Sequence, residues 1–392
     1  MQINNNINSL NYNECDLKYK ILDFINVMGN HNKEAEYAKE LSNGFIVSGG
    51  LDNNLIIYNN ETFSKTFEIK DFNDWPNNVY EIINKERNVD NNLELIVCCK
   101  NAIFFIILDT EELRFTTYKK ILKNISTNIC LEIAKDSYII SGETGVYHLT
   151  NVIYNSKQVI THKQLDKPYK GGIHINNNTI VLTSNSIFPN TGDKLLFYNY
   201  NTDKISKVVK GYSFINTQNG LSLLNLNEEK KILLCACKKY ISGQKNGILL
   251  INPQLEDKQD VIGGFYDTDD FEVYCFCQLY LNDNKTYSNY FLVGGFDNEI
   301  GEGVIKLYKL ITTEKVCDTK IEYILDIVFD IKENFEGFER PISSIIQSKQ
   351  KGNIIVSCWD GNIYLLTPPN LDYLLYNDNL TEYNEELGDA FV

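Results

Sequence analysis

The chain of 392 residues has little arginine, little histidine and no long apolar segment. Its three arginines, Arg87, Arg114 and Arg340, leave few side chains for bidentate contacts with phosphates or bases. Acidic residues outnumber basic ones by 52 to 37, and the net charge is −15. Because a nucleic-acid binder needs a basic surface to meet phosphates, we expect no nucleic-acid partner.

Marks of secretion or membrane insertion are also missing from the sequence. The first residues carry neither the basic stretch nor the apolar core of a signal peptide. Apolar runs such as Ile103 to Leu108 are far shorter than the roughly 20 residues of a membrane span. We therefore expect a cytoplasmic location and no membrane partner. In that compartment the ten cysteines stay reduced and pack in the interior.

Motifs for catalysis and metal binding are scarce. The sequence has no CxxC pair and no nucleophile elbow, and its four histidines are isolated from one another. The acidic segment 263–272 holds Asp267, Asp269, Asp270 and Glu272, whose oxygens could gather around a divalent ion. A solvated loop is the interpretation we favour, and whether these carboxylates bind an ion stays open. We expect no cofactor, no metal site and no catalytic residue.

What the sequence does contain is a sevenfold repeat of one pattern. In each repeat a β-branched or aromatic strand leads through a small polar turn into a second apolar strand, as in hairpins. These hairpins span 45–59, 95–109, 138–151, 180–199, 232–252, 291–309 and 354–367. Their first residues lie 42 to 63 positions apart. That spacing is typical of four-stranded propeller blades of about 40–50 residues, with insertions in the later blades.

Each hairpin is flanked by the other two strands that a blade needs. Apolar runs predict inner strands at 79–84, 129–134, 172–176, 221–227, 274–281 and 342–348. Segments that alternate with charge predict outer strands at 63–69, 114–121, 157–165 and 321–331. Inner strands are buried on both faces, whereas outer strands meet water. The sequence therefore predicts an all-β fold, a seven-bladed β-propeller of four-stranded antiparallel blades.

The last repeat lacks an outer strand of its own, because Pro368 and Pro369 follow it directly and cannot extend a ladder. We expect the alternating segment 17–24 to close the ring by filling that place, with 372–377 as the rival segment. This predicts a flexible segment at 1–16, a single propeller domain at 17–376 and an acidic tail at 377–392.

The layout resembles the WD-repeat family of seven-bladed propellers, with degenerate motifs. The Gly-His dipeptide of that family is absent, and the one literal Trp-Asp pair, Trp359-Asp360, falls in a hairpin turn. The Trp-Asp pair that ends a strand in WD repeats is replaced here by Tyr58-Asn59, Leu108-Asp109, Tyr198-Asn199 and Tyr308-Lys309. Glycine pairs at 49–50 and 294–295 look like kelch repeats, although the Trp that kelch blades carry after the third strand is absent. The choice between the two families stays open.

The resemblance implies a non-enzymatic scaffold or adaptor that binds a protein partner on one face of the ring. Two alternatives stay open: a propeller enzyme of the metal-assisted hydrolase type with its site in the central channel, and a structural subunit of a large assembly. The oligomeric state also stays open.

The binding face is predicted from blade geometry. The turn between the second and third strands and the link to the next blade emerge on the same side, and aromatic rings in such loops are typical of binding hot spots. The predicted protein-binding residues are Trp75, Tyr169, Phe188, Tyr212, Tyr240, Phe265, Tyr266, Phe296, Arg340, Trp359 and Asp360.

Overall fold

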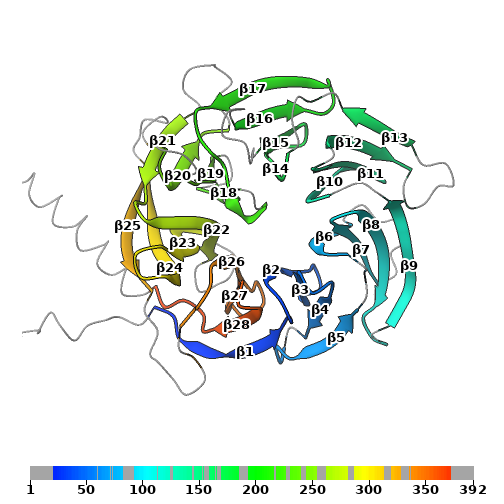
Figure 1. Ribbon diagram of the computed structural model, residues 1–392, viewed down its shortest axis with the longest axis horizontal. Helices are drawn as coiled ribbons and strands as arrows, with labels where there is room; N and C mark the ends of the chain where they lie inside the picture. Colours follow the sequence, from blue (N-terminus) through cyan, green and yellow to red (C-terminus); the bar gives the residue numbers. More distant parts are fainter. Residues whose placement is uncertain are drawn as a thin grey trace, which may run out of the picture.

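Seven four-stranded antiparallel sheets surround a central axis in the computed structural model of the chain (Figure 1). The structure describes residues 21–371 except 60, 71, 73, 83–91, 113, 124–126, 144, 152, 154–158, 164, 166–168, 185–192, 216–217, 227–229, 240–243, 254–261, 281–286, 313–318, 328–334 and 336. The predicted all-β, seven-bladed propeller is confirmed. Within these residues no helix is long and apolar enough to cross a membrane.

The blades follow one another around the ring, each built from the inside outward. Blade one consists of β2 (Ala35–Glu40), β3 (Ile46–Gly50), β4 (Leu55–Tyr58) and β5 (Lys65–Ile69), and blade two of β6 (Pro76–Glu81), β7 (Asn92–Cys99), β8 (Ala102–Asp109) and β9 (Arg114–Lys123). Blade three consists of β10 (Ile129–Ala134), β11 (Ser137–Gly142), β12 (Gly145–Thr150) and β13 (Val159–Lys163). Blade four consists of β14 (Gly171–His174), β15 (Thr179–Ser184), β16 (Lys194–Asn199) and β17 (Lys204–Lys210). Blade five consists of β18 (Leu221–Asn225), β19 (Lys231–Cys237), β20 (Gly247–Ile251) and β21 (Ile262–Asp267). Blade six consists of β22 (Phe271–Tyr280), β23 (Tyr287–Asp297), β24 (Glu302–Thr312) and β25 (Thr319–Asp326). Blade seven consists of β26 (Ile342–Gln347), β27 (Ile354–Cys358), β28 (Asn362–Leu366) and, as its outer strand, β1 (Phe24–Asn30).

Burial falls from the middle of each blade to its rim, as expected from the sequence gradient. Every residue of β3 and β4 is buried, whereas β13 and β17 are mostly exposed. The core therefore lies in the interfaces between neighbouring blades, where apolar side chains of the inner three strands interleave.

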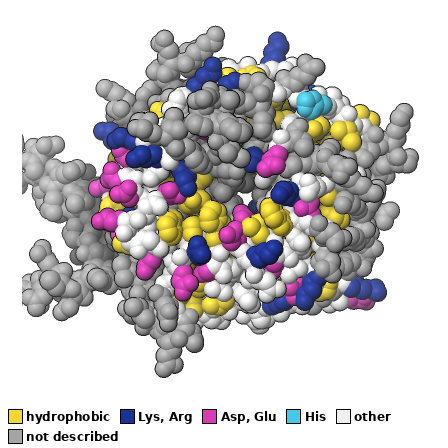
Figure 2. Space-filling model, viewed as in Figure 1, with side chains coloured by type: hydrophobic (Ala, Val, Ile, Leu, Met, Phe, Trp, Pro, Cys, Tyr) yellow, Lys and Arg dark blue, Asp and Glu magenta, His cyan; other side chains and the backbone are white. Residues whose placement is uncertain are grey.

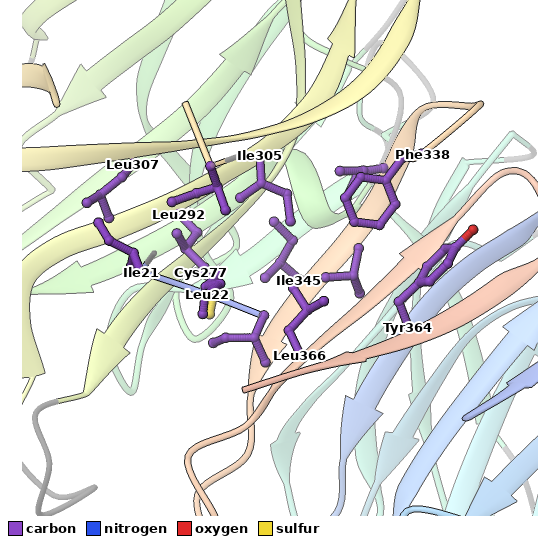
Figure 3. Packing of buried hydrophobic residues seen from close by; sticks show 14 of the residues in the cluster. Ile21, Leu22, Cys277, Leu292, Ile305, Leu307, Phe338, Ile345, Tyr364 and Leu366 are labelled. Carbon is purple, nitrogen blue, oxygen red and sulfur yellow. The ribbon is translucent and has the colours of Figure 1, made fainter. Parts of the chain in front are cut away.

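An N-terminal strand closes the ring, as predicted, but it lies further along the chain than 17–24. The closing strand β1 pairs with β28, and the backbone pairing continues from Asp23 to Thr367 (2.8 Å). Ile21 and Leu22 are buried between blades six and seven, next to side chains such as Leu292 and Leu366 (Figure 3). Because these two residues serve as an apolar anchor, the strand begins only after them. Residues 1–20 and 372–392, which include the rival segment and both predicted tails, lie outside the described residues.

Three strands were not predicted, and one of them corrects an interpretation. β2 and β17 carry too many charges to stand out as strands. β21 and the first residues of β22 take up most of the acidic segment 263–272, so most of that segment is not a loop. It forms the outer edge of blade five and leads through 268–270 into β22.

Side chains near the ends of four inner strands fasten neighbouring blades together. Each accepts a hydrogen bond from a backbone N–H of the preceding blade around the ring. The pairs are Glu81 with Ser42 (2.7 Å), Glu40 with Lys349 (2.8 Å), Gln347 with Tyr280 (2.6 Å) and Gln278 with Asn225 (2.8 Å). These bonds lie where the inner strands end, so the ring is held rigid on that side.

Candidate functional site

The links between blades and the turns after the second strands meet on one side of the ring, which we call the loop face. Backbone hydrogen bonds join them, for example from Trp359 to Pro341 (3.0 Å) and from Lys238 to Ser213 (2.8 Å). The inner strands start at this face and end at the opposite face. The predicted geometry of the two loop sets is therefore present.

One group of polar and aromatic side chains on the loop face joins blades five, six and seven. We call it the mouth cluster: Lys238, Glu272, Tyr274 and Trp359. The Lys238 ammonium lies 2.5 Å from the Glu272 carboxylate and donates to the Tyr274 hydroxyl at 3.1 Å. That hydroxyl donates in turn to Glu272 (2.9 Å), and the Tyr274 ring meets the Trp359 indole edge-on at 5.1 Å.

Local sequence explains how this cluster forms. Glu272 and Tyr274 lie near the start of β22, where a register shift between Val273 and Cys275 interrupts the pairing with β23, and the Tyr274 hydroxyl reaches the Glu272 carboxylate. Lys238 follows the apolar strand β19 directly, so its charge lies where the chain emerges. Trp359 begins the turn after β27, and its indole Nε1 is buried with no hydrogen-bond partner among the described residues.

Three more predicted residues lie beside or near this face in accessible positions. Trp75 is half-buried in the link before β6, with the Lys100 ammonium 4.2 Å from its ring centroid. Arg340 is exposed in the link before β26. Asp360 accepts hydrogen bonds from the Asn362 backbone (2.7 Å) and the Tyr364 hydroxyl (2.5 Å), so its carboxylate stabilises the turn.

The remaining predicted aromatic residues belong more to the blades than to the loops. Tyr212 and Phe265 stack on each other at 5.6 Å, and Tyr266 packs edge-on against Tyr308 at 5.6 Å. Phe265, Tyr266 and Phe296 lie on strands and are half-buried, so their assignment to loops was wrong.

Tyr169 is fully buried in the interface between blades three and four, and its prediction as an exposed ring was wrong because the ring fills that core. Phe188 and Tyr240 lie outside the described residues.

The acidic residues proposed as metal ligands are divided between different partners. Asp267 pairs with Lys245, and this hydrogen bond lowers the pKa of the Asp267 carboxyl. Glu272 belongs to the mouth cluster, while Asp269 and Asp270 form an exposed turn. Among the described residues no three His, Cys, Asp or Glu side chains are placed to hold a metal ion.

The central channel contains a cavity of about 340 Å³. Its lining comes from the inner strands of blades one, three, four, five, six and seven: Ala38, Lys39, Leu131, Gly172, Ile173, His174, Asn219, Leu221, Cys275, Phe276, Ser344, Ile345 and Ile346. Burial lowers the pKa of the Lys39 ammonium to about 8 and also lowers the pKa of His174. At neutral pH the cavity therefore holds one cation and a neutral imidazole.

Sequence reasoning singled out Trp359 and Glu272 but missed the other half of the mouth cluster and the polar residues that line the channel. Lys238, Tyr274, Lys39 and Asn219 were not singled out. Lys238 could have been found because it directly follows the apolar strand β19, whereas Lys39 lies in a strand with three charges and carries no such signal.

Comparison with known proteins shows the fold and nothing finer. No family model matches the sequence, and no curated protein is similar to it. Among solved structures the chain is similar to the β-propeller domain of Myceliophteria thermophila Cps50 (Swd1), with 10% identity and a TM-score of 0.55. The match covers 87% of this chain and 99% of that domain. At this identity the likeness supports a seven-bladed propeller without separating WD repeats from kelch repeats.

Proposed function

We propose that the chain is a non-enzymatic, cytoplasmic interaction scaffold that binds a protein partner on its loop face, around the mouth cluster. A rigid ring with functional loops on one side suits this role, because scaffold rigidity lowers the entropy lost on binding. The likeness to another propeller is analogy and adds only general support.

The observation that carries the proposal is the chemistry of the mouth cluster. A tryptophan and a tyrosine lie edge-on beside a paired lysine and glutamate, and exposed Arg340 belongs to the link directly before the same blade as Trp359. Aromatic residues and arginine are the side chains most enriched at interface hot spots. Figure 2 shows hydrophobic, basic and acidic side chains side by side around the central hollow of the ring.

A matched pair of charge reversals tests the proposal. Arg340 and Lys349 are both exposed cations next to β26, one before it on the loop face and one after it on the opposite face. We expect Arg340→Glu to weaken partner capture from native cell extract by at least about tenfold, and Lys349→Glu to leave capture unchanged. Both variants should melt like the wild type, because neither side chain carries a described contact.

The opposite pattern, loss of capture with Lys349→Glu alone, would place the interface on the other side of the ring. Trp75→Ala extends the test to blade two, where the Lys100 ammonium lies over the Trp75 ring. Since the net charge of −15 repels polyanions, we also expect no salt-sensitive binding to DNA or to anionic vesicles. A partner recovered in fixed stoichiometry under every condition would favour the role of an assembly subunit.

A further inference from the structure

The lining of the channel cavity is mostly apolar and includes one lysine, Lys39. Six of its lining side chains are large and apolar: Leu131, Ile173, Leu221, Phe276, Ile345 and Ile346. Among the described lining residues, Lys39 is the one whose side chain is a cation at neutral pH. A volume of about 340 Å³ is at the small end of ligand sites in proteins, which bind compact organic molecules.

Lys39 has no carboxylate partner within the part of the chain that the structure describes. Its ammonium donates to the Val79 carbonyl at 3.0 Å and lies 4.2 Å from the centroid of the Tyr80 ring. An ammonium out of bulk water normally has a counter-charge, because removal from water is costly for an unpaired ion.

Asn219 separates the cavity from the loop face. It lies in the short 3₁₀ helix η2 (Gln218–Gly220), which precedes β18 and extends towards the middle of the ring (Figure 1). The Asn219 amide donates across the channel to the carbonyls of Ser343 (2.9 Å) and Glu36 (3.4 Å). Lys39 and His174, by contrast, lie near the far ends of their strands, so access is from the opposite face.

We propose that the channel cavity binds a small carboxylate with an apolar body, which enters from the opposite face and pairs with the Lys39 ammonium. The carboxylate supplies the missing counter-charge, and the apolar body replaces water against the six apolar side chains. This site is separate from the loop face and does not depend on the proposed protein partner.

Calorimetric titration of the full chain at pH 7 tests this with three probes that share one chain length: decanoate, decanol and decylammonium. We expect decanoate to bind, decanol to bind at least tenfold more weakly, and decylammonium not to bind. Lys39→Met should reduce decanoate affinity at least tenfold while leaving decanol affinity unchanged. The matched control Lys204→Met removes an exposed lysine of β17 on the outer rim and should change neither.

Thermal melting separates a ligand site from a structural role of Lys39. If Lys39→Met lowers the melting temperature, Lys39→Gln, which can still donate to Val79, replaces it in the titrations. The proposal is overturned if decanoate fails to bind the wild type, if decanol binds as tightly as decanoate, or if both uncharged variants keep full decanoate affinity.

Discussion

Blades one and six place a tyrosine at the same position of the third strand and use it in different ways. Tyr58 lies opposite Ile46, and Tyr308 lies opposite Phe291. In blade one the Tyr58 hydroxyl meets the Ser48 hydroxyl at 3.2 Å, and Ser48 meets His31 Nε2 at 2.9 Å. The other ring nitrogen of His31 lies 2.9 Å from the Asp52 carboxylate. A buried polar chain thus ties the link before blade one to its hairpin.

In blade six the corresponding tyrosine, Tyr308, is held by packing against other side chains. Val293 stands where blade one has Ser48, two residues after the partner of the tyrosine. The Tyr308 ring packs against Phe291 (5.7 Å), Tyr266 (5.6 Å) and Tyr323 (5.8 Å). The large ring of this position is therefore held in two different ways, by a polar chain in blade one and by aromatic packing in blade six. This explains how a propeller tolerates repeats as degenerate as these.

Breaking the polar chain at its centre should have the largest effect. His31→Ala removes one hydrogen-bond partner of Ser48 and one of Asp52, whose carboxylate side chain is only 5% exposed. We expect a loss of about 3 kcal/mol in the free energy of unfolding, measured in urea, because a buried carboxylate loses a hydrogen bond.

The control for this variant is another histidine paired with a serine. His148 Nε2 lies 2.8 Å from the Ser137 hydroxyl, but His148 is only half-buried. His148→Ala should cost less than about 1 kcal/mol, since water can replace the lost bond. Equal losses of unfolding free energy in the two variants would show that the buried hydrogen bonds of His31 stabilise the protein no more than the half-buried one of His148.

Giving blade one the residue of blade six should have the next largest effect. Ser48→Val leaves His31 Nε2 and the Tyr58 hydroxyl without their shared partner, and we expect a cost of about 2 kcal/mol. Ser48→Ala should cost nearly as much in the same urea experiment, because it removes the hydroxyl without adding volume. If only the valine variant is destabilised, crowding and not the polar chain is responsible.

The fold was predictable from the sequence wherever burial and propensity agree. The inner strand at 129–134 coincides with β10, and all seven predicted hairpins are present. β2 was missed because its sequence, AEYAKE, carries three charges in a position that is apolar in other blades. One of those charges is Lys39. The strand whose sequence departs from the apolar pattern of inner strands is therefore the one that contributes the lysine of the channel site.

The candidate site was less predictable, because it depends on how blades meet. Tyr169 and Trp75 both precede an inner strand, yet one is buried in a blade interface and the other is accessible. The sequence places both rings in links and does not distinguish them. The mouth cluster likewise joins Lys238 and Trp359, which are more than a hundred residues apart and become neighbours only in the assembled ring.

Removing the two tyrosine hydroxyls compares the blades directly, with a smaller effect. Both rings are almost fully buried, so Tyr58→Phe and Tyr308→Phe keep their packing. We expect Tyr58→Phe to cost about 1 kcal/mol, because Ser48 loses a partner, and Tyr308→Phe to change stability by less than about 0.5 kcal/mol. A larger loss in blade six than in blade one would overturn the comparison.

The smallest expected effect is a pH dependence of the gap between the wild type and His31→Ala. Burial would raise the pKa of Asp52, but hydrogen bonds from His31 and from the backbone of Asn32 and Asn54 outweigh it and lower the pKa. A carboxyl whose pKa is lowered by folding stabilises the protein above its ordinary value near 3.9, and loses that contribution as the pH falls through the lowered pKa. His31→Ala has less of this contribution to lose. The gap in unfolding free energy should therefore be narrower at pH 3.5 than at pH 7, by roughly 0.5 kcal/mol.

The gap for Tyr58→Phe, which leaves the bond between His31 and Asp52 in place, should stay constant. A gap for His31→Ala that widens in acid would show that Asp52 is not held in its charged form by His31.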